Sequence, residues 1–194
     1  MFKDDSNLSS KCSEKLALNM STLCSKNIVM TGQTIDKIFY KDGRVEEIVG
    51  HNLVVDSFTK LVMSLIKNHS GYTGIQYWAI GSGAPFWDSE LPNPTKDEIK
   101  LTNEIGRVAI DPSNITFVDE DFREVSSPSN ILQIVHTFGA TDCNGIWREF
   151  GIFGGNASST ANSGIMINKR HHAVITKTED MVIERTIRFT LNLA

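Results

Sequence analysis

The final segment of the chain has the clearest alternation of apolar and polar residues. Ile183, Ile187, Phe189, Leu191 and Leu193 occupy one parity, and polar residues occupy the other. Such alternation is typical of a β-strand with one buried face and one solvated face. Arg185 lies on the apolar parity, and a buried guanidinium group is costly unless it is paired. We therefore predict a strand over residues 181–193 and a partner for Arg185.

Similar runs of β-branched and aromatic residues predict strands along most of the chain. In chain order they lie at residues 28–30, 34–40, 44–49, 77–80, 106–110, 115–118, 131–138, 147–153 and 164–173. Asp42-Gly43 lies between two of these runs and favours a tight hairpin, because both residues accept positive φ angles. Strands that do not alternate with helices indicate antiparallel sheet. The predicted fold class is mainly β, an antiparallel β-sandwich-like domain with one amphipathic helix and a polar N-terminal arm.

One helix is predicted at about residues 56–69. Its apolar residues are spaced by three and four positions, which places them on one helix face: Phe58, Leu61, Val62, Leu65 and Ile66. We expect this face to pack on the sheet. Asp56 is a plausible N-cap because its carboxylate can accept from free amides of the first turn, and Gly71 is a plausible stop.

The remaining segments define the domain organisation. Residues 1–26 are polar and are predicted to form an N-terminal arm, and residues 27–194 a single β-rich domain. Pro85, Pro92 and Pro94 mark a loop that cannot pair into a central sheet. Residues 154–164 are all small or polar, so we expect a mobile surface loop that buries nothing.

Composition and charge narrow the choice of partners. The chain has 194 residues, 40% hydrophobic and 22% charged, which suits one globular unit. Its formal charge of −4 and pI near 5.7 are unfavourable for binding the negatively charged phosphate backbone of nucleic acid. Apolar runs are far shorter than a membrane span needs, and the first residues lack the apolar core of a secretion signal. We expect synthesis in the cytoplasm, reduced thiols, no nucleic-acid partner and no membrane insertion.

The candidate catalytic residues have more ordinary structural interpretations. His171 and His172 are adjacent, so on a strand they point to opposite faces and cannot easily bind one metal ion. The carboxylates of residues 119–121 and 46–47 are neighbours in sequence, which does not supply the facing pair of a glycosidase. Cys143 lies in a turn-forming string. We predict no catalytic residues, no metal, no cofactor and no enzymatic activity.

Four residues are candidates for an interface or a ligand contact. Aromatic residues cluster near one loop, where Trp87 beside Asp88 could stack on a sugar ring, although the core and a subunit interface are the commoner uses of such side chains. Arg148 and Glu149 place opposite charges between Trp147 and a second aromatic residue. A pair there would fix a register or a neighbour contact. The candidates are therefore Trp87, Asp88, Arg148 and Glu149.

Three sequence blocks, taken in order, resemble a known family. They are GHNLVVD at residues 50–56, WAIGSG at 78–83 with LTNEIGR at 101–107, and TFGA at 137–140 with NGIWREFGIF at 144–153 and ITKT at 175–178. Together they resemble small bacteriophage and prophage virion structural proteins of a tail-fibre-like, collar or baseplate-associated family. The resemblance spans roughly residues 28–194 and does not include the arm or the proline-rich insertion.

The resemblance implies a β-rich module of the virion tail or neck that forms a homo-oligomer, contacts other tail or neck proteins and performs no catalysis. On this basis we expect residues 1–26 to become ordered by contact with neighbours. One alternative is a receptor- or carbohydrate-binding module on the particle, with a host surface glycan as partner. A weaker alternative is a head decoration protein. The sequence has no long β-rich shaft, which favours the structural subunit over an adhesion fibre.

Overall fold

The computed structural model describes residues 27–193, so the predicted arm at residues 1–26 lies outside the described residues. Residues 31–190 form one unit, and the described residues 27–30 and 191–193 belong to another. The outer ends of the first and last strands therefore fall in the second unit. The description below concerns residues 31–190.

The fold is mainly β, as predicted, with one α-helix and ten antiparallel strands in a curled, sandwich-like sheet within the described residues. The strands are β1 (Ile28–Tyr40), β2 (Val45–Val54), β3 (Thr73–Gly81), β4 (Glu104–Ala109), β5 (Ile115–Val118), β6 (Glu124–Val125), β7 (Ile131–Phe138), β8 (Gly145–Gly155), β9 (Ile165–Lys177) and β10 (Met181–Leu193). The predicted hairpin joins β1 and β2, with Gly43 at φ +86°. Two short 3-10 helices, η1 (Pro85–Asp88) and η2 (Pro112–Asn114), lie in loops.

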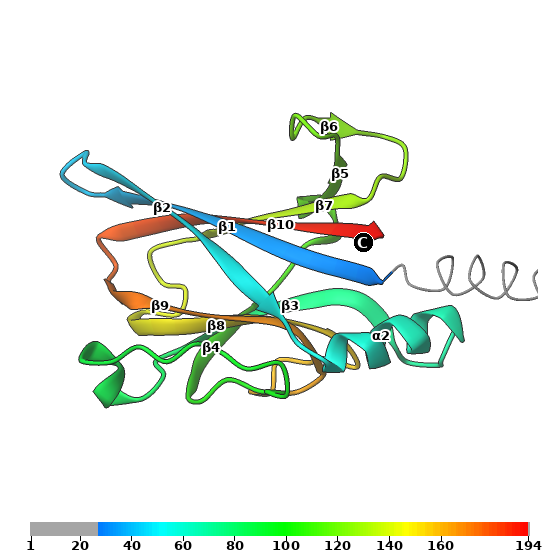
Figure 1. Ribbon diagram of the computed structural model, residues 1–194. Helices are drawn as coiled ribbons and strands as arrows, with labels where there is room; N and C mark the ends of the chain where they lie inside the picture. Colours follow the sequence, from blue (N-terminus) through cyan, green and yellow to red (C-terminus); the bar gives the residue numbers. More distant parts are fainter. Residues whose placement is uncertain (1–26, 194) are drawn as a thin grey trace, which may run out of the picture. The chain divides into compact units, whose positions relative to one another are not determined.

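The sheet folds over into two layers, visible as the upper and lower sets of strands in Figure 1. Its strand order is β4-β3-β8-β9-β2-β1-β10-β7-β5-β6. We call β1, β10, β7, β5 and β6 layer A, and β4, β3, β8 and β9 layer B. Strand β2 joins the layers, because most of its length pairs with β1 while Leu53 and Val54 pair with β9.

An apolar core fills the space between the layers. Trp78 of β3 packs edge-to-face on Phe138 of β7 at 5.9 Å between ring centroids, and it also contacts Phe150 of β8. On β10, Ile183 and Ile187 are fully buried, and the buried residues alternate with partly exposed ones. This confirms the predicted strand with one buried face as far as Phe189, whereas Leu191 and Leu193, predicted on the same face, are 46% and 68% exposed.

A second apolar cluster lies on the opposite face of layer B. Its buried members are Val55, Ala79, Leu101, Phe153 and Met166. The loop between β3 and β4, whose Leu101 is only 1% exposed, helps to cover this face. Layer B is therefore buried on both faces, and the β3–β4 loop contributes Leu101 to the apolar cluster on its outer face.

The helix, α2 (Ser57–Ile66), is shorter than predicted and buries less of its apolar face. Leu61 is 2% exposed, but Leu65 is 39% and Ile66 70% exposed, so the expectation that the whole face packs on the sheet is wrong. The reason is local: the first turn is fixed to β9, where the Ser57 hydroxyl donates to the Met166 carbonyl at 2.6 Å. The C-terminal turn is more exposed.

Both predicted helix ends also need correction. The Asp56 carboxylate makes no capping hydrogen bond, although Asp56 does occupy the N-cap position. The helix ends at Ile66, ahead of Gly71, and Asn68 adopts the left-handed conformation with φ +54°. An asparagine can take that conformation at modest cost, so the chain turns before the glycine is reached. No helix within residues 27–193 is long and apolar enough to cross a membrane.

The loop after β8 does bury part of itself, contrary to the prediction. Ala157 packs against the apolar cluster on layer B. The loop is held by Arg107 of β4, whose Nη1 donates to the carbonyl of Ser158 at 2.8 Å. The Asn162 amide donates to Glu104 Oε2 at 2.7 Å. Small side chains allow the loop backbone to approach these charged groups, which composition alone did not indicate.

Candidate functional site

Glu149 of β8 is fully buried and fastens the end of the β3–β4 loop to layer B. Its Oε2 and Oε1 accept hydrogen bonds from the backbone amides of Thr102 and Asn103 at 3.0 and 2.9 Å. Gly81 on the adjacent strand pairs with Glu149, and a Cβ at Gly81 would lie 2.6 Å from the Glu149 Cγ. The glycine therefore leaves room for the carboxylate.

Lys169 of β9 neutralises this buried carboxylate. Its Nζ lies 3.1 Å from Glu149 Oε2 and 3.0 Å from Glu98 Oε1, and the Lys169 side chain is only 1% exposed. Lys169 also donates to the Lys100 carbonyl at 3.3 Å. One buried ammonium thus joins β8, β9 and the loop.

Arg148 and Trp87 fasten the other end of the same loop. Arg148 forms a bidentate pair with Asp88, with Nε–Oδ1 and Nη2–Oδ2 distances of 2.6 Å each, and its Nη1 donates to the Ser82 carbonyl. The hydrogen bonds from Arg148 lower the pKa of Asp88. The Trp87 ring stacks on His171 at 4.2 Å between ring centroids.

The structure thus brings the four predicted contact residues to one loop–strand junction. Arg148 and Glu149 do not pair with each other; they pair with Asp88 and Lys169. Trp87 is 7% exposed and Glu149 is fully buried by the chain itself, whereas the Asp88 side chain is 52% exposed. With the loop in this position, Asp88 is the most accessible of the four, and its contact with a partner or ligand stays a prediction.

A second polar cluster lies between the layers, centred on the ion pair of Asp36 and Arg185. Arg185 Nε–Asp36 Oδ1 is 2.5 Å and Arg185 Nη2–Asp36 Oδ2 is 2.8 Å. Both residues are at most 1% exposed, so Arg185 has the partner that its position on the apolar parity required. Burial by itself would raise the pKa of Asp36, but the charge and hydrogen bonds of Arg185 outweigh it and hold the pKa below its ordinary value.

Aromatic rings of β8 enclose the Arg185 guanidinium. Its Cζ lies 4.3 Å from the Phe150 ring centroid and 5.5 Å from that of Trp147. Residues three apart on a regular strand would face opposite sides. The register of β8 against β9 shifts between Trp147 and Glu149, which allows both rings to face the interior.

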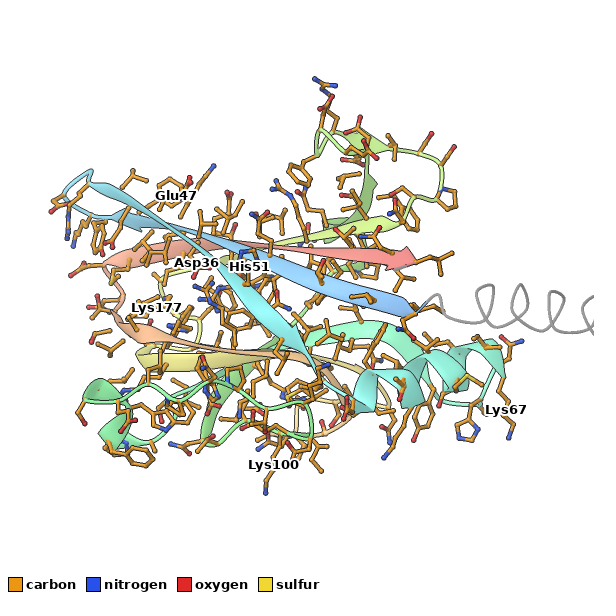
Figure 2. The ribbon with its side chains drawn as sticks, viewed as in Figure 1. Asp36, Glu47, His51, Lys67, Lys100 and Lys177 are labelled. Carbon is orange, nitrogen blue, oxygen red and sulfur yellow. The ribbon has the colours of Figure 1, made fainter. Side chains whose placement is uncertain are left out.

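Arg170 and Asn52 complete the interior cluster, and two glycines make space for them. A Cβ at Gly50 would lie 2.1 Å from Arg170 Nη2, and one at Gly32 would lie 2.2 Å from Asn52 Oδ1. Arg170 is 8% exposed and Asn52 9% exposed. Figure 2 shows nitrogen-bearing side chains gathered below Asp36, between the layers.

His172 faces this cluster, whereas His171 faces the loop, as the opposite-face argument predicted. Burial, followed by the positive charge of Arg185, lowers the pKa of His172 to about 3. Protonation of His172 is therefore unfavourable in the folded protein, and its imidazole is neutral at neutral pH. The His171 Nδ1–H donates to the Pro92 carbonyl at 2.8 Å.

We expect this histidine to make stability depend on pH. Because its folded pKa lies below the unfolded value near 6.5, its contribution is complete above pH 6.5 and declines as the pH falls toward 3. Between pH 7 and pH 5 the loss should be about 2 kcal/mol for this group. Urea unfolding at both pH values, compared with His172→Gln, measures it.

His136 and His171 also have pKa values lowered by burial, so part of the pH dependence should remain in His172→Gln. His51→Gln, which replaces an exposed histidine of β2, is the matched control. An equal loss of stability between pH 7 and pH 5 in wild type and His172→Gln would contradict the assignment.

The remaining candidates for chemistry are occupied in local structure. Burial raises the pKa of Cys143 to about 11, which keeps it a thiol at neutral pH. Within residues 27–193, no group of three or more His, Cys, Asp or Glu side chains is arranged to hold a metal ion. Lys177 Nζ donates to the Gly139 carbonyl at 2.6 Å and to Asn144 Oδ1 at 2.8 Å, which fixes the turn between β7 and β8.

Sequence reasoning missed Asp36, Asn52, Lys169 and Arg170. A signal was present for Asp36, because it shares its parity with Ile38 in a predicted strand, as Arg185 does with its apolar neighbours. Lys169 and Arg170 lie in a run of consecutive polar and charged residues, which gives no parity signal. Their burial depends on layer B being covered on both faces.

Comparisons of the chain with protein-family models, with curated proteins and with solved structures found no match.

Proposed function

We propose that this chain is a non-enzymatic structural subunit of a bacteriophage tail or a related contractile particle, at a collar, a baseplate or a fibre attachment point. In that role it assembles as a homo-oligomer with other tail or neck proteins. It is made in the host cytoplasm and ends in the virion. The proposal starts from the three sequence blocks that resemble virion structural proteins.

The observation that carries the proposal is the use of those blocks inside the fold. Arg148 and Glu149, from the third block, hold both ends of the β3–β4 loop. Thr102 and Asn103, from the second block, donate to Glu149. Side chains of the third block and backbone amides of the second block thus hold the loop in place, which suits a rigid subunit that must keep its shape in an assembly.

One observation favours the receptor- or glycan-binding alternative. Phe86 is 66% exposed in η1, and Asp88 in the same turn is half-exposed. An exposed aromatic ring next to a carboxylate can stack on a sugar and accept hydrogen bonds from its hydroxyl groups. The full chain and its Phe86→Ala variant on a glycan array test this: binding lost in the variant would support the alternative.

The structural role is tested on particles from the strain that encodes the chain. We expect the chain in gradient-purified particles, with side-chain density in the tail or neck, and particles from a deletion strain should lack that part. Density for the chain on the head would contradict the tail location and would support the alternative of a head decoration protein. Intact infectious particles without the chain, or hydrolysis of peptidoglycan or capsular polysaccharide by the purified protein, would contradict it.

A further inference from the structure

The interior polar cluster carries more positive than negative charge. Arg170 and Arg185 are guanidinium groups, and the low pKa of His172 keeps it neutral. The charges that act on Arg170 are those of Arg185 and Asp36. Among the described residues of this cluster, two positive charges and one negative charge leave a net charge of +1, and an uncompensated buried ion is costly.

Hydrogen-bond donors in the same cluster lack acceptors. Within residues 27–193, Arg170 Nη1, Arg185 Nη1 and Asn52 Nδ2 are buried without a hydrogen-bond partner. Asp36 accepts from Nε and Nη2 of Arg185, and none of these three donors forms a hydrogen bond with its carboxylate. Leaving such donors unsatisfied is unfavourable, so the cluster is built for an acceptor that the chain's described residues do not provide.

We propose that a small monovalent anion binds between the two layers, held by Arg170 with Arg185 and Asn52. This site does not rest on the proposed function. The net charge selects an anion over a cation, and it favours an anion over water because water would satisfy donors without neutralising the charge. Guanidinium groups are suited to the role because they present several N–H donors in a fixed plane.

The cluster has features that make it a built site. Arg170 is more than nine-tenths buried, and the absence of side chains at Gly50 and Gly32 leaves space for Arg170 and Asn52. The donors come from β9, β10 and β2, so the anion would join layer A, layer B and the strand that connects them. Asn52 Oδ1 and His172 Nε2 also lack partners within the described residues, and ordered water can donate to them.

Bromide is the probe, because it is monovalent and can be located by anomalous scattering. The full chain is unfolded and refolded thermally at constant ionic strength, with bromide replacing gluconate. We expect the Tm of the wild type to rise with bromide and to saturate, by about 5–10 °C at a hundredfold excess over the dissociation constant. A wild-type crystal in bromide should show an anomalous peak between the layers next to Arg170.

Two variants separate this site from general salt effects. Arg170→Met removes the uncompensated charge and should lose most of the bromide-dependent rise. Arg188→Met should keep it, because Arg188 is on β10 but pairs with Gln133 and lies over Phe122 instead of joining the cluster. If Arg170→Met does not fold, the anomalous peak in the wild type decides. No interior peak, or the same Tm rise in wild type and Arg170→Met, would overturn the proposal.

Discussion

Asp36→Asn is expected to lower the free energy of unfolding by about 3–5 kcal/mol. The substitution removes the carboxylate charge that pairs with Arg185, while asparagine keeps nearly the same size. Arg185 has no exposed surface, so its guanidinium cannot turn to water for compensation. Equilibrium urea unfolding at pH 7 measures the loss.

Two further variants test whether the charge is responsible. Asp180→Asn breaks an ion pair with Lys41 in which both side chains are exposed, and it should cost at most about 1 kcal/mol. The double variant Asp36→Leu with Arg185→Leu removes both charges and should recover most of the stability lost in Asp36→Asn. A loss below about 1 kcal/mol in Asp36→Asn would show that the pair is not desolvated in the folded protein.

The strands could be predicted because their signals are local. Strands β5 and β7 have the predicted bounds, since alternating or continuous apolar residues and flanking turn residues are read directly from the sequence. The helix existed where its periodicity placed it, but its burial did not follow. Periodicity says which residues share a face, and only the packing partner decides how much of that face is covered.

The polar clusters could be predicted only in part. The position of Arg185 on an apolar parity indicated a partner, but the partner is 149 residues earlier in the chain, and one sequence does not pair such positions. Arg148 and Glu149 were identified as important because of their aromatic neighbours. Their partners are set by the β3–β4 loop folding over layer B, an arrangement that depends on long-range packing.

Glu149→Gln is expected to lower the free energy of unfolding by about 3 kcal/mol and to loosen the β3–β4 loop. Glutamine keeps one carbonyl acceptor but loses the charge that balances Lys169, whose ammonium is buried with it. It also cannot accept from both the Thr102 and Asn103 amides through two equivalent oxygens. Faster hydrogen exchange at these two amides should accompany the loss.

Glu98→Gln is the matched control for the Glu149 prediction, because it changes the other carboxylate that contacts Lys169. Glu98 is 28% exposed at its side chain and does not accept from Thr102 or Asn103, so its replacement should cost less and leave their exchange rates nearly unchanged. If both variants lost the same stability and showed the same exchange pattern, neutralisation of the Lys169 charge alone would account for the position of the β3–β4 loop. Faster exchange confined to Glu149→Gln would show that the hydrogen bonds from Thr102 and Asn103 to Glu149 of β8 hold the loop in position.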